Sequence, residues 1–165
     1  MLPAVLYYLR REVVSLALHH VAVLERRRNV VADRLPETAQ KLFREPNFAH
    51  LATLMPDGSP QVTPVWVDYD GRHILVNTAE GRQKPRNIRR DPRVAIDIIS
   101  REDPYRMVTV RGRVVEVSNE GADEHIDKLA KKYLGQDKYP FRAPGEQRVM
   151  FKIEPEYVTA WPPAA

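Results

Sequence analysis

Two tight-turn signals constrain the fold of this chain more than any other feature. The turn residues 56–59 (PDGS) separate an apolar-rich run at 48–54 from an alternating run at 61–69, and 70–71 (DG) separate that run from 73–78. Asp-Gly is favoured in short hairpin turns because glycine tolerates positive φ. Parallel strands need a crossover of a dozen or more residues, so turns this short join antiparallel neighbours. The sequence therefore predicts three consecutive antiparallel strands and disfavours an all-parallel α/β fold.

The rest of the chain continues as short strands with inserted helices. We expect further strands at 95–99, 106–117, 148–153 and 157–161, and helices at 35–43 and 119–134. Gly112 marks a bulge or bend in the long strand, because glycine weakens a regular strand. The helix at 35–43 is of the kind that closes one end of a barrel. About seven short strands with helices at two or three points predict a mainly β, α+β fold, a small antiparallel β-barrel with peripheral helices.

Composition excludes several classes of function. The chain has no cysteine, which rules out disulfides, zinc-cysteine sites and thiol catalysis, and we expect a cytoplasmic location. Its five histidines are scattered apart from one adjacent pair that faces two sides of a helix, so we expect no metal site. His50 could act as a base, but a lone histidine on a strand is usually structural. The chain also lacks the G-x-S-x-G, G-x-G-x-x-G and Walker motifs.

The charge balance favours a small anionic ligand at least as much as nucleic acid. The net charge is +4, from 26 basic and 22 acidic residues that are interspersed along the chain. Such a modest excess, without a ribonucleoprotein signature or a helix-turn-helix pattern, predicts no nucleic-acid partner.

The segment 80–94 (EGRQKPRNIRRDPRV) is the strongest candidate for a binding site. Gly81 and the proline four residues later mark a helix start near Arg82, and an Asp-Pro pair ends the helix. Free backbone N–H groups and the helix dipole favour a phosphate at such a start, and Arg82 and Lys84 add two positive charges. The alternative is a basic helix that is simply solvated, as charge runs usually are.

Three spaced motifs resemble the pyridoxamine-phosphate-oxidase-like split-barrel superfamily. They are FAHLATL at 48–54, DGSPQVTPVW at 57–66 and GRQKPRNIRRDPRV at 81–94. Within this superfamily the chain is most similar to the branch of deazaflavin (coenzyme F420)-dependent reductases, over about residues 36 to 161. The resemblance implies a split antiparallel β-barrel that forms a homodimer, with two equivalent cofactor sites at the subunit interface.

The resemblance also implies which residues bind the cofactor. Arg82 and Lys84 would bind its phosphate, and residues of the strand 61–66 would line its ring system, although Trp66 could equally be a core aromatic. Tyr105, Arg106 and the region 139–148 would come from the second subunit. The complete predicted set is Gln61, Thr63, Pro64, Val65, Trp66, Asn77, Thr78, Arg82, Gln83, Lys84, Asn87, Tyr105, Arg106 and Arg148.

This resemblance implies an F420-dependent oxidoreductase that transfers a hydride between reduced deazaflavin and a small unsaturated organic substrate. FMN is the alternative cofactor, as in a pyridoxamine-phosphate-oxidase-like oxidase or reductase, because both molecules have a tricyclic ring and a phosphate. A non-catalytic flavin, deazaflavin or haem carrier is a further alternative. The cofactor would perform the hydride chemistry, so we assign no catalytic residue. Strand 106–117 has apolar residues on both faces, which also favours a homodimer.

Residues 2–28 have the three- and four-residue periodicity of an amphipathic helix. Charged residues interrupt it too often for a membrane span, and no cleavage site of a signal peptide follows, so we expect no membrane partner. The helix could pack on the domain, lie across a dimer partner, or result from a start site placed too early. We assign residues 1–35 to an N-terminal extension and 36–165 to the cofactor-binding domain, and we expect deletion of 1–30 to change F420 affinity by only a few fold.

Overall fold

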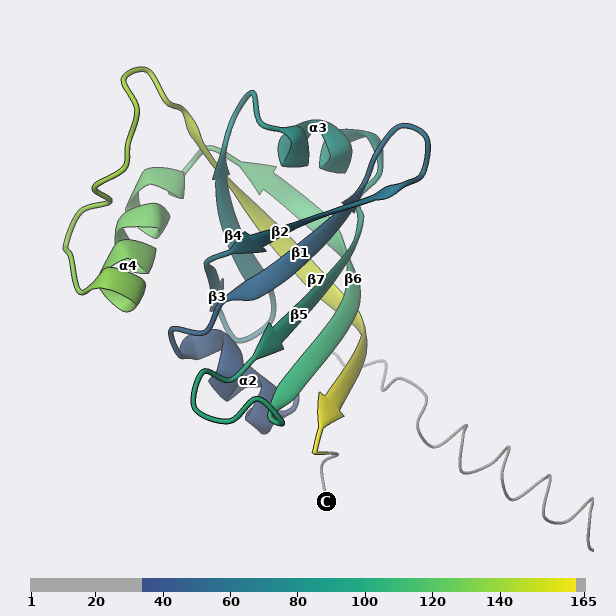
Figure 1. Cartoon of the computed structure of the whole chain (residues 1–165). Helices are drawn as coiled ribbons and strands as arrows, with labels where there is room; N and C mark the ends of the chain where they lie inside the picture. Colours follow the sequence, from purple (N-terminus) through teal and green to yellow (C-terminus); the bar gives the residue numbers. More distant parts are fainter. Residues whose placement is uncertain (1–33, 163–165) are drawn as a thin grey trace, which may run out of the picture.

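A curled antiparallel sheet of seven strands is the frame of the computed structural model, which describes residues 34–162 (Figure 1). Three helices accompany the sheet within the described residues, and the predicted mainly β fold is confirmed. The elements in chain order are α2 (Glu37–Arg44), β1 (Ala49–Leu54), β2 (Pro60–Val65), β3 (Val67–Tyr69), β4 (Ile74–Ala79), α3 (Gln83–Arg90), β5 (Arg93–Ile99), β6 (Met107–Ser118), α4 (Ala122–Leu134) and β7 (Arg148–Trp161). The predicted helix at 2–28 lies outside the described residues.

Both predicted hairpins are present. Gly58 has φ 84° in the turn between β1 and β2, where the Ser59 amide and hydroxyl both donate to Asp57 Oδ1, at 3.0 and 2.6 Å. Gly71 has φ 104° in the turn between β3 and β4. The positive φ angles explain why glycine occupies these two positions.

The prediction of one strand at 61–69 is wrong, because the chain breaks at Trp66 into β2 and β3. These two strands lie at opposite edges of the sheet, in the order β2-β1-β5-β6-β7-β4-β3. In a flat sheet, strands at these positions would be about 29 Å apart, given the usual spacing of about 4.8 Å. Only Trp66 separates them in the chain, so the sheet has to curl until its edges meet. The open barrel is therefore a consequence of this topology.

Side chains of α4 hold the backbone at this break. Tyr133 accepts a hydrogen bond from the Val67 amide at 3.1 Å and donates to the Asn47 carbonyl at 2.6 Å. Lys132 donates to the carbonyls of Val67 at 2.7 Å and Phe43 at 2.5 Å. The helix thus fixes the point at which the two sheet edges meet.

The two strands predicted at 148–153 and 157–161 form the single strand β7. Gly112 of β6 lies opposite Pro155 in the register, and the pairing shifts there, which confirms the predicted bulge. A Cβ atom on Gly112 would be 2.3 Å from the Glu154 carbonyl oxygen. The missing side chain at 112 therefore leaves room for the backbone of β7 to approach closely at Glu154.

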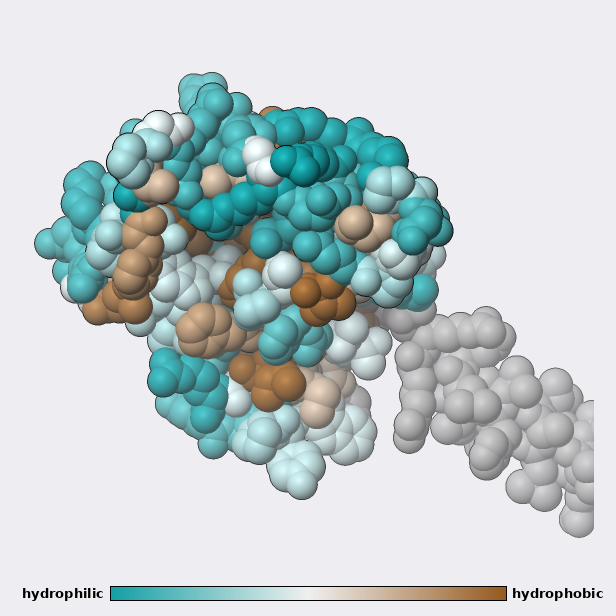
Figure 2. Space-filling view, turned by 45° about the horizontal axis from the view of Figure 1, so that its top comes forward, coloured by the Kyte–Doolittle hydropathy of each residue, from teal (hydrophilic) through white to brown (hydrophobic). Residues whose placement is uncertain are grey.

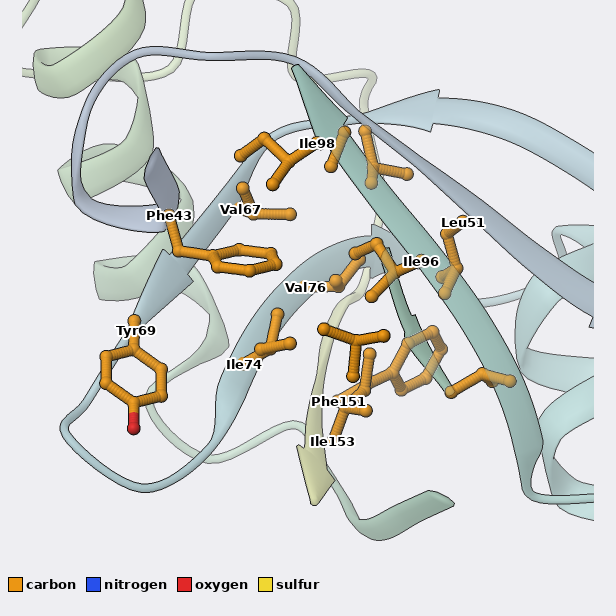
Figure 3. Close-up of a cluster of buried hydrophobic side chains, with 14 of the residues drawn as sticks. Phe43, Leu51, Val67, Tyr69, Ile74, Val76, Ile96, Ile98, Phe151 and Ile153 are labelled. Carbon is orange, nitrogen blue, oxygen red and sulfur yellow. The ribbon is translucent and has the colours of Figure 1, made fainter. Parts of the chain in front are cut away.

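The hydrophobic core fills the inside of the curled sheet. Phe43 of α2 is fully buried and extends toward Val67 and Val76 (Figure 3). Helix α2 lies across one end of the barrel and α3 lies at the other (Figure 1). Burial of apolar side chains on the inner face, with polar residues outside, is the main source of stability for such a sheet. Within residues 34–162, no helix is long and apolar enough to cross a bilayer.

Candidate functional site

A cavity of ≈ 230 Å³ opens beside the start of α3. Its walls come from the β2–β3 break, the end of β4, helix α4 and the segment that leads into β7. The space-filling view shows a hollow with hydrophobic surface inside, bordered on one side by further hydrophobic surface and elsewhere mostly by hydrophilic residues (Figure 2). The residues that line the cavity are Phe48, Pro64, Val65, Trp66, Asn77, Thr78, Arg82, Lys84, Ile126, Tyr139, Phe141 and Arg148.

Helix α3 supplies the cationic end of the cavity. As predicted, the helix begins next to Arg82, after Gly81 with φ 77°. Lys84 is half-buried, and its Nζ donates to the Thr63 hydroxyl at 3.0 Å. Burial, and then the charge of Arg82, lower the pKa of Lys84. The Thr63 hydroxyl cannot neutralise the lysine, so an anion in the cavity would stabilise its charged form.

A second arginine reaches the cavity from β7. Arg148 is buried, and its guanidinium lies 5.2 Å from the centre of the Tyr139 ring. Its Nη1 donates to Glu146 Oε1 at 2.8 Å, and Arg82 Nη2 donates to Glu146 Oε2 at 2.9 Å. Burial tends to raise the pKa of Glu146, but the hydrogen bonds and charges of the two arginines outweigh it and lower the pKa. Glu146 therefore links the two arginines as an ionised carboxylate.

The cavity wall also includes Thr78, whose hydroxyl is buried. Thr78 is 1% exposed, and its Oγ1 makes no hydrogen bond within residues 34–162. Buried polar atoms are usually satisfied, and leaving one unsatisfied costs roughly 1 to 3 kcal/mol. The hydroxyl and the neighbouring cations therefore fit a ligand that carries hydrogen-bonding groups and an anion.

Aromatic side chains form another part of the cavity wall. Trp66 stacks on Tyr133, with ring centres 5.0 Å apart and planes at 5°, and Tyr139 meets it edge-on at 5.9 Å. Phe141 in turn meets Tyr139 at 5.7 Å. Trp66 thus lines the cavity and also packs against α4, and its contact with a cofactor stays a prediction. A flat aromatic ligand fits such a wall, because aromatic rings gain from stacked or edge-on contacts.

Three of the predicted residues hold α3 on the sheet instead of lining the cavity. Asn87 is fully buried, and its Nδ2 donates to Thr53 Oγ1 at 2.9 Å and to Gln61 Oε1 at 3.3 Å. Gln83 Nε2 donates to Asn87 Oδ1 at 2.8 Å. Gln61, Gln83 and Asn87 therefore support the position of Lys84 without facing the cavity of this chain.

Tyr105 and Arg106 lie away from this cavity. Tyr105 is 73% exposed, and Arg106 lies 3.7 Å from Glu45 beside α2, at the other end of the barrel. Their expected contribution from a second subunit stays a prediction. Arg148, which we also expected from the second subunit, lines the cavity of its own chain.

The predicted set lacks four lining residues, Phe48, Ile126, Tyr139 and Phe141. It also lacks Glu146, which bonds to two arginines of the cavity wall. Phe48 precedes a strand, and Ile126 belongs to an apolar helix face, so each looks like an ordinary core residue in the sequence. Tyr139, Phe141 and Glu146 lie within the region 139–148 that we expected from a partner. The alternation of aromatic residues at 139 and 141 is the local signal that could have indicated a wall.

A buried histidine behind the cavity makes stability depend on pH. His125 is 7% exposed, and burial is the main reason that its pKa falls to about 4, against the attraction of Asp68. Above pH 6.5 the ring is neutral in both states. As pH falls from 6.5 towards 4, the unfolded chain gains a proton that the folded protein resists, so stability decreases.

We expect this histidine to account for about 2 to 3 kcal/mol of the stability lost between pH 7.5 and 4.5. Urea unfolding of the wild type and of His125→Asn at both pH values measures it. The carboxylates contribute to the loss in both proteins, whereas the histidine contributes only in the wild type. An equal loss in the two proteins would show that His125 does not resist protonation.

An open seven-stranded barrel with a cationic helix start beside an aromatic-walled cavity defines the class of split-barrel proteins that bind flavin-type cofactors. The family model for pyridoxamine 5'-phosphate oxidase matches residues 35–162, and the chain belongs to this family. The expected resemblance to this superfamily is confirmed.

Solved structures agree with this assignment. A structure named F420 reductase is 33% identical with a TM-score of 0.67, over 76% of this chain and 98% of that chain. A conserved hypothetical protein from Mycobacterium tuberculosis is 26% identical with a TM-score of 0.59, over 79% and 87%. A putative pyridoxamine 5'-phosphate oxidase from Lactobacillus delbrueckii is 25% identical with a TM-score of 0.58, over 81% and 99%.

Proposed function

We propose that the protein is an F420-dependent oxidoreductase that transfers a hydride between the reduced deazaflavin and a small unsaturated organic substrate. The observation that carries this proposal is the pairing, in one cavity, of the half-buried cation Lys84 with an aromatic wall. Thr78 of the same wall has a buried hydroxyl without a partner among residues 34–162. The similarity to the F420 reductase supports the choice of cofactor.

The lining residues suit the parts of such a cofactor. Arg82 and Lys84 would hold its phosphate, and the Thr78 hydroxyl would bond to a polar group. Trp66 and Tyr139 would pack against the ring system and exclude water from it. The bound deazaflavin supplies the hydride chemistry, while the protein binds and orients it. No side chain is assigned as a proton donor, since solvent can supply the proton.

FMN is the second candidate, because the family takes its name from an oxidase and an FMN phosphate would suit the same cations. Purification from a host that lacks F420 separates the two. We expect a colourless protein that then binds F420 in a fluorescence titration and turns over with a panel of enones and quinones. A yellow protein with stoichiometric FMN would mean that the cofactor is FMN instead of F420. Binding of F420 without turnover would indicate a carrier.

We also propose a homodimer that assembles through the outer face of the sheet. The strand register places Ile99, Met107 and Trp161 side by side on three neighbouring strands, where they are 38%, 36% and 53% exposed. Adjacent exposed apolar side chains of this size are typical of a surface that another protein covers.

Light scattering at micromolar concentration should give twice the mass of the chain. Met107→Glu should shift the protein towards the monomer, because two copies of the charge would be buried in the contact. Arg101→Glu, at an exposed residue of the β5–β6 loop, is the control and should leave the mass unchanged. A wild-type protein that is monomeric under these conditions would exclude the dimer.

A further inference from the structure

A chain of hydrogen bonds runs from a buried histidine of α4 to the arginine in the cavity wall. Arg148 Nε donates to Asn77 Oδ1 at 2.8 Å. The other end of the same amide, Asn77 Nδ2, lies 2.7 Å from the Ala122 carbonyl and 3.3 Å from His125 Nδ1. Arg148, Asn77 and His125 are all buried, so water cannot readily replace any of these partners.

The chemistry of the groups fixes which atom donates and which accepts in each of these hydrogen bonds. The guanidinium of Arg148 can only donate, so Asn77 has to present its oxygen to the arginine. The amide nitrogen of Asn77 then carries two N–H donors, which face the Ala122 carbonyl and His125. His125 Nδ1 therefore has to accept, and the neutral ring carries its hydrogen on Nε2. A protonated ring would point an N–H at the amide donors and oppose the arrangement.

The surroundings of His125 keep it in this neutral form. Burial acts first, and Lys128 and Lys132 of α4 and Arg148 of β7 add charges that disfavour protonation. Asp68 of β3 is the charge that favours it. Nε2 has no hydrogen-bond partner among residues 34–162, so the contact with Asn77 is what the ring contributes to the polar network.

We propose that His125 is a positioning residue, which as a neutral acceptor fixes the amide of Asn77 and thereby holds Arg148 in the cavity wall. Arg148 is bonded through Glu146 to Arg82, so the position of the histidine affects both arginines of the cavity. The consequence for cofactor affinity rests on the proposed function, whereas the orientation of Arg148 does not.

Two substitutions separate this role from a general loss of packing. His125→Asn places a carbonyl oxygen close to the position of Nδ1, so it restores the acceptor for Asn77. His125→Gln carries its oxygen further out, near the position of Nε2, and leaves the donor of Asn77 unpaired. Both variants lose the ring and keep an amide, so both should show the same loss of packing in urea unfolding, and His125→Gln should in addition show the cost of the unpaired donor, roughly 1 to 3 kcal/mol.

Nuclear magnetic resonance tests the proposal without any ligand. We expect the ¹⁵N shifts of the His125 ring in the wild type to be those of the neutral form with hydrogen on Nε2. Hydrogen exchange of Arg148 Nε–H should be slow in the wild type and in His125→Asn, and roughly fivefold faster in His125→Gln, which corresponds to the loss of one hydrogen bond. A ring with hydrogen on Nδ1, or equal exchange in all three proteins, would overturn the proposal.

A fluorescence titration with F420, and in parallel with FMN, tests the consequence for binding. For the cofactor that the wild type binds, His125→Asn should keep the affinity within about twofold, and His125→Gln should weaken it roughly fivefold. Equal affinities in the three proteins would overturn the role in binding. If the wild type binds neither cofactor, the proposed function fails, and the exchange of Arg148 Nε–H alone decides whether His125 positions the arginine.

Discussion

Lys84→Ala should weaken cofactor binding by roughly ten- to a hundredfold, because a charge-assisted hydrogen bond to a phosphate contributes about 1.5 to 3 kcal/mol. The stability of the folded state should decrease little in this variant. Lys84 is half-buried, has a lowered pKa and has only a neutral partner, Thr63, among the described residues. Removing a charge that the fold disfavours leaves the free energy of unfolding nearly unchanged. Fluorescence titration and urea unfolding of the same samples measure both quantities.

Arg86→Ala is the matched control for this variant. Arg86 lies on the same helix, is exposed, and donates to the Gly81 carbonyl without lining the cavity. Its replacement should leave cofactor affinity within about twofold, so any general effect of removing positive charge from α3 appears here. The loss for Lys84→Ala should also shrink at high salt, where charges are screened. Equal cofactor affinities of the two variants would contradict the proposed anion site at Lys84.

Arg82→Ala should affect cofactor binding less than Lys84→Ala, although both residues lie at the start of α3. Its side chain is half exposed and already paired with Glu146 at 2.9 Å. An anion that binds Arg82 has to compete with this carboxylate, so the arginine should contribute less than Lys84. We expect a smaller loss of affinity than for Lys84→Ala in the same titration, and a larger one would show that Glu146 moves away when the cofactor binds.

Gly112→Ala should destabilise the fold by about 2 to 4 kcal/mol, the largest effect on stability that we expect from adding one methyl group. The added Cβ would lie 2.3 Å from the carbonyl oxygen of Glu154 and 3.3 Å from Ile153 Cγ2. The first contact is with backbone, which cannot rotate away as a side chain can. The strands β6 and β7 would therefore have to separate at the bulge. Urea unfolding measures the loss.

Gly58→Ala is the control for this prediction. Gly58 lies in the β1–β2 turn with φ 84°, and a Cβ there meets no atom within 4 Å. Its cost should be only the strain of a positive φ, about 1 to 2 kcal/mol. A loss for Gly112→Ala no larger than this would mean that β6 and β7 do not approach as closely as described.

Features that depend on neighbouring residues could be read from the sequence. The Asp-Gly turns form hairpins because glycine relieves a local steric restriction, and the start of α3 follows from Gly81 and Pro85. Arg82 and Lys84 were found because a helix start concentrates N–H groups and positive charge within one turn of chain. None of these depends on which strands pair.

Only the three-dimensional structure shows how distant segments meet. The run 61–69 has an unbroken strand pattern, yet the pairing of β2 with β1 and of β3 with β4 breaks it at Trp66. Likewise, Asn87 and Lys84 lie three residues apart on α3, but one bonds to the sheet and the other lines the cavity. The bridge from Arg82 through Glu146 to Arg148 joins residues that are more than sixty positions apart. Such contacts depend on the curl of the whole sheet, because it brings together side chains whose local sequences carry no sign of one another.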